Sequence, residues 1–227
     1  MFIYDELIQS LDKLIKNYPL KKMDVSNAIF AENKNQIIFK PDKAFELGGG
    51  SYHGLALNLF SVEPFEDEII LIGEDSDKIK NDTNYARISI FSCMEEDLKR
   101  GNLYQNIRRI DYMKYQFALD GVMLRESAIN NKESLLFSKK RVPIKDVGSY
   151  LIDLYKKHPI IQNVKIIFIN LATFDYKELK SLKNKEEGIT KALDHLSNKV
   201  KMDCSICKLE PICTEISKLV DNDFKKE

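Results

Sequence analysis

The chain has 227 residues, of which 44% are hydrophobic and 31% are charged, a composition typical of globular proteins with a sizeable core. Because 35 basic and 35 acidic residues cancel to a net charge of 0, the sequence excludes the overall positive field that favours nucleic-acid binding. No apolar run approaches the ~20 residues of a membrane span, and no basic leader opens the chain, so we expect a cytoplasmic protein without a membrane segment.

The first part of the chain predicts one helix and a pair of strands. Apolar residues at helical spacing predict an amphipathic helix over residues 2–16. Two short strands at 28–31 and 36–39 flank a polar turn. Three glycines follow at 48–50. No P-loop or dinucleotide-binding fingerprint surrounds them, so we interpret them as a strained loop and not as a phosphate cradle.

The middle of the chain predicts further strands at 55–60, 68–73 and 85–91. The acidic stretch at 74–77 lacks the ligand spacing of a calcium loop, and we interpret it as a solvated turn. The longest helical pattern covers residues 95–119, with Gly101 weakening its early part.

Arginines on and after this helix are the candidates for binding a phosphate-bearing cofactor. They are Arg108, Arg109 and Arg125. A solvated helix face is the alternative explanation for the first two.

The last third predicts alternating elements and ends in a cysteine motif. The predicted elements are a strand pair at 121–125 and 134–138, a helix over 147–155 capped by Asp146, a strand at 164–171, and helices at 175–182 and 186–200. We therefore predict a single α/β (α+β) domain over residues 1–200, with a mixed β-sheet flanked by helices, and a small cysteine-bearing tail over 201–227.

Three of the four cysteines form the motif C-x2-C-x5-C, as Cys204, Cys207 and Cys213. Thiolates at this spacing suit an iron–sulfur cluster or zinc, and a disulfide is a poor alternative in the reducing cytoplasm. We predict a [4Fe–4S] cluster, with zinc or three incidental thiols as the alternatives. The fourth ligand is left open between Cys93, a partner, a small ligand and an open coordination site.

Several segments, in order, carry a family resemblance. Residues 45–49 read Phe-Glu-Leu-Gly-Gly, residues 68–75 read Glu-Ile-Ile-Leu-Ile-Gly-Glu-Asp, and a predicted helix leads into Gly-Val-Met at 121–123. With the three tail cysteines, these segments resemble the β-subunit family of the CO dehydrogenase/acetyl-CoA synthase complex over residues 24–216. The cysteine spacing is also similar to the opening of the auxiliary-cluster motif of radical SAM enzymes.

The departures limit what this resemblance implies. Gly50 and Glu74 replace family prolines, residues 124–127 read Leu-Arg-Glu-Ser where the family has Gly-Gln-Arg-Asp, and the gap before Cys213 is shorter. The nickel-binding Cys-Gly-Cys site has no counterpart. The resemblance implies the synthase's middle-domain fold and an iron–sulfur cluster, but not acetyl-CoA synthesis.

Three functions follow as alternatives. The first is an iron–sulfur accessory or electron-transfer protein that acts with a corrinoid protein or methyltransferase in one-carbon metabolism. The second is an enzyme with an open position on a three-cysteine cluster. The third is a non-catalytic binding module in which a metal staples the tail. We favour the first, and the sequence leaves open whether the protein is an enzyme.

Overall fold

The computed structural model describes residues 3–25, 54–75, 78, 84–99, 103–116, 144–197, 211–214 and 216–217. Its elements, in chain order, are α1 (Asp5–Ile15), β1 (Lys21–Met23), β2 (Gly54–Ser61), β3 (Glu68–Ile72), β4 (Tyr85–Cys93), α2 (Glu95–Lys99), α3 (Leu103–Gln116), α5 (Ile144–Tyr155), β5 (Ile161–Ile169) and α6 (Tyr176–Ser197).

The five strands form one mixed sheet in the order β1-β3-β5-β4-β2. The pairs β3–β5 and β2–β4 are parallel, whereas β1–β3 and β4–β5 are antiparallel. Every residue of β4 is buried, as expected for a strand near the middle of a sheet that is covered on both faces.

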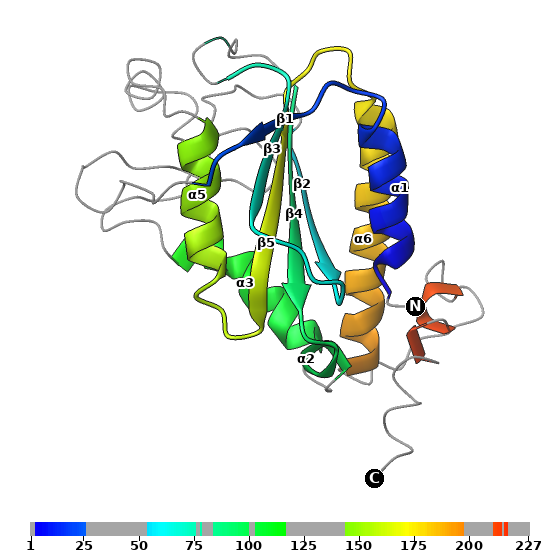
Figure 1. The fold of residues 1–227 in the computed structure, drawn as a ribbon. Helices are drawn as coiled ribbons and strands as arrows, with labels where there is room; N and C mark the ends of the chain where they lie inside the picture. Colours follow the sequence, from blue (N-terminus) through cyan, green and yellow to red (C-terminus); the bar gives the residue numbers. More distant parts are fainter. Residues whose placement is uncertain are drawn as a thin grey trace, which may run out of the picture.

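Helices cover both faces of this sheet (Figure 1). α1 and α6 pack against each other on one face and contact β2. α5 lies on the other face against β3 and β5, with α3 beside it, and α3 also contacts α6. This arrangement confirms the predicted fold class, a mixed β-sheet flanked by helices.

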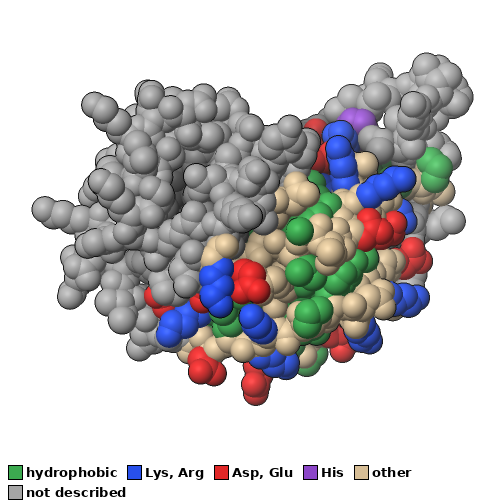
Figure 2. All heavy atoms as spheres, turned by 90° about the horizontal axis from the view of Figure 1, so that it is seen from above, with side chains coloured by type: hydrophobic (Ala, Val, Ile, Leu, Met, Phe, Trp, Pro, Cys, Tyr) green, Lys and Arg blue, Asp and Glu red, His purple; other side chains and the backbone are tan. Residues whose placement is uncertain are grey.

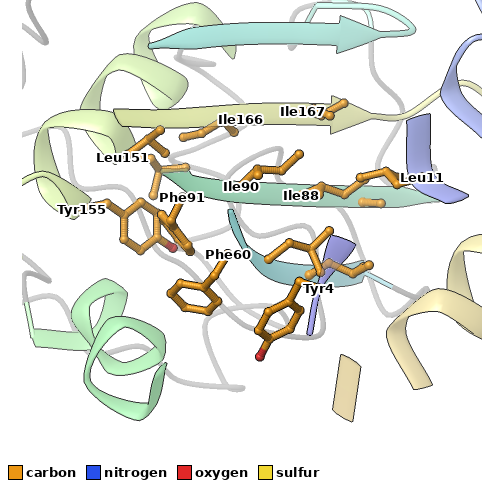
Figure 3. Close-up of a cluster of buried hydrophobic side chains, with 14 of the residues drawn as sticks. Tyr4, Leu11, Phe60, Ile88, Ile90, Phe91, Leu151, Tyr155, Ile166 and Ile167 are labelled. Atoms are coloured by element: carbon orange, nitrogen blue, oxygen red, sulfur yellow. The ribbon is translucent and has the colours of Figure 1, made fainter. Parts of the chain in front are cut away.

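A row of aromatic rings crosses the core at the β2–β4 side of the sheet (Figure 3). The ring centroids of Tyr4 and Phe60 are 5.5 Å apart, those of Phe60 and Phe91 are 5.2 Å apart, and those of Phe91 and Tyr155 are 4.8 Å apart. The row thus joins the segment before α1 to β2, β4 and α5. Contacts of this kind stabilise the folded state by more than the burial of the ring surfaces alone would.

Most predicted elements within the described residues are confirmed, and the exceptions have physical reasons. The predicted helices at 175–182 and 186–200 are one continuous helix, α6. The pattern over 95–119 forms two helices, α2 and α3. The edge strand β1 was not predicted, because three residues are too short for a periodic signal. The predicted strands at 28–31, 36–39, 121–125 and 134–138 and the glycines at 48–50 lie outside the described residues.

Two surface properties agree with the sequence. No helix in the described ranges has the length and apolarity that crossing a membrane requires. Acidic, basic and hydrophobic side chains are intermixed over the described part of the face in Figure 2. That part of the face therefore carries no patch of a single charge sign.

Candidate functional site

The cysteine motif is described at its third member. Cys204 and Cys207 lie outside the described residues, whereas Cys213 lies in a helical turn over residues 211–214. Cys213 is half-buried and packs with Ile212 against the hydrophobic core. Three residues after Cys213, Ile216 is only 1% exposed. One thiol of the motif is therefore held at the edge of the folded domain.

Cys93, the predicted candidate for a fourth ligand, is the last residue of β4 and is 1% exposed. Burial, with a smaller contribution from the carboxylate of Asp97, raises the pKa of its thiol to about 12. The thiol is therefore protonated at neutral pH and packs as a small apolar side chain.

The segment that holds Cys213 lies on the outer side of α1 and α6 in Figure 1, whereas the end of β4 lies on the sheet side of α6. Within the described ranges, no three His, Cys, Asp or Glu side chains are grouped to hold a metal ion. Cys93 as a fourth ligand stays a prediction.

The arginines predicted to bind a cofactor are described in part. Arg108 and Arg109 are consecutive on α3, so their side chains leave the helix in different directions. The side chain of Arg108 is 41% exposed, with its Nη1 3.9 Å from Oδ2 of Asp111. Arg109 is exposed and lies close enough to His158 to contribute, after burial, to lowering the pKa of that imidazole. Arg125 lies outside the described residues, and the common site of the three arginines stays a prediction.

A buried polar cluster that the sequence did not predict lies where α3, α6, β2 and the segment before α1 meet. We call Tyr4, Asn58, Asp111, Glu186 and Thr190 the interior polar cluster. Asn58 on β2 donates a short hydrogen bond from its side-chain amide to the Asp111 carboxylate on α3. The Thr190 hydroxyl donates to Oε1 of Glu186 at 3.4 Å. Tyr4 and Glu186 are 0% and 4% exposed.

The electrostatics of the cluster follow from this burial. Desolvation raises the pKa of Glu186, and the nearby charges of Asp111 and Glu187 add to the rise. Lys183 opposes it, since its ammonium lies 2.5 Å from Oε2 of Glu186. Burial and the charge of Glu186 raise the pKa of Tyr4 well above its ordinary value. Glu186 and Tyr4 therefore hold their protons more tightly than they would in water, at the place where α3 packs against α6.

A signal for this cluster was present in the sequence. Glu186 follows Leu182 by four residues and precedes Ile189 by three, so it occupies the buried stripe of α6. A glutamate at such a position needs partners inside the protein. Its hydrogen-bond and ion-pair partners, Thr190 and Lys183, lie four and three residues away on α6. Asp111 and Tyr4 approach it from other segments, which sequence periodicity does not bring together.

The carboxyl ends of β3 and β5 form a second polar arrangement. The Asn170 side chain accepts a hydrogen bond from the backbone N–H of Glu74 and donates one to its carbonyl, both at 2.8 Å. Gly73, at φ 130°, allows the approach, because a Cβ there would lie 2.1 Å from Oδ1 of Asn170.

The start of α5 is fixed by the same loop. Asp75 accepts a hydrogen bond from the backbone N–H of Ile144 at 2.9 Å and so caps α5. The prediction that Asp146 caps this helix was therefore wrong, since α5 begins two residues earlier. In the acidic stretch at 74–77, which was predicted to be a solvated turn, the Glu74 side chain is 57% exposed, whereas the Asp75 side chain bonds to Ile144; residues 76 and 77 lie outside the described residues. The described residues at this edge are thus bonded to one another.

Comparisons of the chain with models of protein families, with curated proteins and with solved structures found no match. The resemblance to the acetyl-CoA synthase β-subunit family therefore stays a prediction.

Proposed function

We propose that Cys204, Cys207 and Cys213 hold a [4Fe–4S] cluster and that the protein is an accessory or electron-transfer protein. The observation that carries this proposal is the position of Cys213, which is half-buried on a helical turn packed against the core. A cluster held there is fixed to the domain and remains near the surface, where a single electron can pass to a partner.

The charges next to the cysteines in the sequence favour a redox role over an inert one. Lys199, Lys201 and Lys208 flank the motif. Positive charge stabilises the reduced, more negative cluster and raises its reduction potential. The resemblance to the synthase family suggests a corrinoid protein or a methyltransferase as the partner. Arg108, Arg109 and Arg125 are proposed to bind a phosphate-bearing cofactor of that system.

Zinc is the alternative metal, and it would make the tail a structural staple. A tail of this size has little core of its own, so a bound metal would contribute much of its folding free energy. The partial burial of Cys213 and the nearly complete burial of Ile216 suit this function as well. The two functions differ in redox behaviour, because zinc has no accessible second oxidation state.

A spectroelectrochemical titration of the anaerobically purified protein tests the proposal. We expect one reversible one-electron transition, and we expect Cys204→Ala, Cys207→Ala and Cys213→Ala each to abolish it. Cys93→Ala tests the predicted fourth ligand, because the transition is lost if the buried Cys93 binds the cluster and survives if another group fills that position. Metal binding without a redox transition would show that the metal is structural and that the protein does not transfer electrons. A transition that shifts on adding a small thiol or cyanide would indicate the open-site enzyme.

A further inference from the structure

The segment after the motif's third cysteine has a buried face and an exposed face. Ile216 is buried at 1% exposure and belongs to the hydrophobic core, and Ile212 and Cys213 pack against that core. Pro211 and Thr214 are exposed. Residue 216 follows residues 212 and 213 by four and three positions, which places all three on one side of a helical turn. The turn therefore docks on the domain by the side that carries the cysteine.

From this packing we infer that Ile216, assisted by Ile212, anchors the cysteine tail to the domain, so that metal binding and domain stability are thermodynamically linked. The inference rests on the proposed metal site. Figure 1 places residues 211–217 near the amino terminus, beside α1 and α6. The folded domain thus fixes one of the three sulfur ligands before the metal binds.

The linkage has a direct physical reason. A ligand that binds the folded state and not the unfolded one stabilises the folded state by mass action. If the tail were unattached, its metal would stabilise the tail alone, and the sheet would unfold as it does without metal. Because Ile216 shares the core with the sheet, we expect the tail and the sheet to unfold as one unit.

Thermal unfolding of loaded and metal-free protein tests the anchor. The wild type is reconstituted anaerobically with ferrous iron and sulfide, or with zinc in a parallel sample. Unfolding is followed through the near-ultraviolet circular dichroism of the tyrosines in the core. We expect the loaded wild type to unfold about 5–10 °C above the metal-free protein.

Two variants separate the anchor from the metal site. Ile216→Ala should keep the metal stoichiometry and lose most of the difference in unfolding temperature between loaded and metal-free protein. Leu20→Ala is the matched control, because Leu20 is a large apolar residue at 43% exposure, and it should keep both. If Ile216→Ala does not fold, Ile216→Val replaces it and should show a smaller loss in the same direction.

The outcomes show separately whether the anchor fails and whether the metal site fails. An equal unfolding temperature for loaded and metal-free wild type would overturn the anchor while leaving the metal site intact. So would a full temperature difference in Ile216→Ala. If the wild type binds neither iron nor zinc, the proposed function itself fails, and the inference falls with it.

Discussion

Asn170 is the residue that closes the polar end of the β3–β5 pair. Its side-chain amide makes two hydrogen bonds to the backbone of Glu74, and the residue is 5% exposed. Asn170→Ala leaves a buried donor and acceptor without partners, so we expect a loss of about 1–3 kcal/mol in the free energy of unfolding. Urea unfolding measures it. Asn170→Asp keeps the acceptor but places a buried carboxylate oxygen against the Glu74 carbonyl, so at neutral pH it should lose at least as much as alanine; a clearly smaller loss would contradict this account.

Glu186 gives the domain a pH dependence of defined sign. Because burial raises its pKa, the folded protein holds the Glu186 proton more tightly than the unfolded protein does. This contribution to stability is fully present below the unfolded pKa of ~4.3. It is lost as the pH rises through the higher pKa of the folded state.

We therefore expect Glu186→Gln to become more stable relative to the wild type as the pH rises from 4.5 to 8, because glutamine does not ionise. Urea midpoints at several pH values measure the change. Glu187→Gln is the control, since the Glu187 side chain is 49% exposed, and it should remove little of the dependence. A constant difference between Glu186→Gln and the wild type across this range would show that Glu186 does not titrate differently on folding.

At the scale of single residues, the sequence indicated which chemistry a site can carry better than it indicated which residues surround that site. The spacing of Cys204, Cys207 and Cys213 is a local signal, and it suggests a metal without knowledge of the fold. The partners Lys183 and Thr190 of Glu186 lie on the same helix at helical spacing, whereas no local pattern predicts that Asp111 and Tyr4 come close to it from other segments. The position of Cys93 inside the core is likewise set by the sheet.

The packing of α5 on the sheet depends on a glycine. A Cβ at Gly148 would lie 2.8 to 3.0 Å from three side-chain carbons of Ile69 on β3. Gly148→Ala gains up to about 1 kcal/mol of helix propensity, but we expect the overlap to outweigh it and to destabilise the protein by about 1–3 kcal/mol.

A double-mutant cycle tests the origin of this effect. The substitution Gly148→Ala should cost less in an Ile69→Ala background, because the shortened side chain leaves room for the new methyl group. Urea unfolding of the four proteins gives the coupling energy. Additive effects would mean that the glycine is required for a reason other than its contact with Ile69.

The helix α6 shows why element boundaries were harder to predict than elements. The polar residues around Lys183 indicated a break between two helices, but the helix continues through them. Lys183 forms ion pairs with Glu186 and Glu187, at spacings of three and four residues, and these pairs stabilise a helix from within. The polar stretch is therefore part of the helix.

For the whole molecule, the fold class could be predicted because strands and helices alternate with clear periodicities. The strands β2, β3, β4 and β5 were predicted from apolar runs, and their burial confirms the reason. The order of the strands in the sheet could not be derived in this way, since strand pairing depends on contacts between distant segments. The function is harder to predict than the fold, because a fold does not determine what a tail binds.

Iron and acid-labile sulfide analysis of the anaerobically purified wild type, together with its visible absorption spectrum, tests the central claim most directly. We predict about four irons and four sulfides per chain, a broad visible absorption, and the loss of all three in Cys213→Ala. A content of one zinc and no sulfide would show that the motif holds a structural zinc ion and not an iron–sulfur cluster. Absence of both metals, or an unchanged iron content in Cys213→Ala, would contradict the claim that the cysteine motif is a metal site.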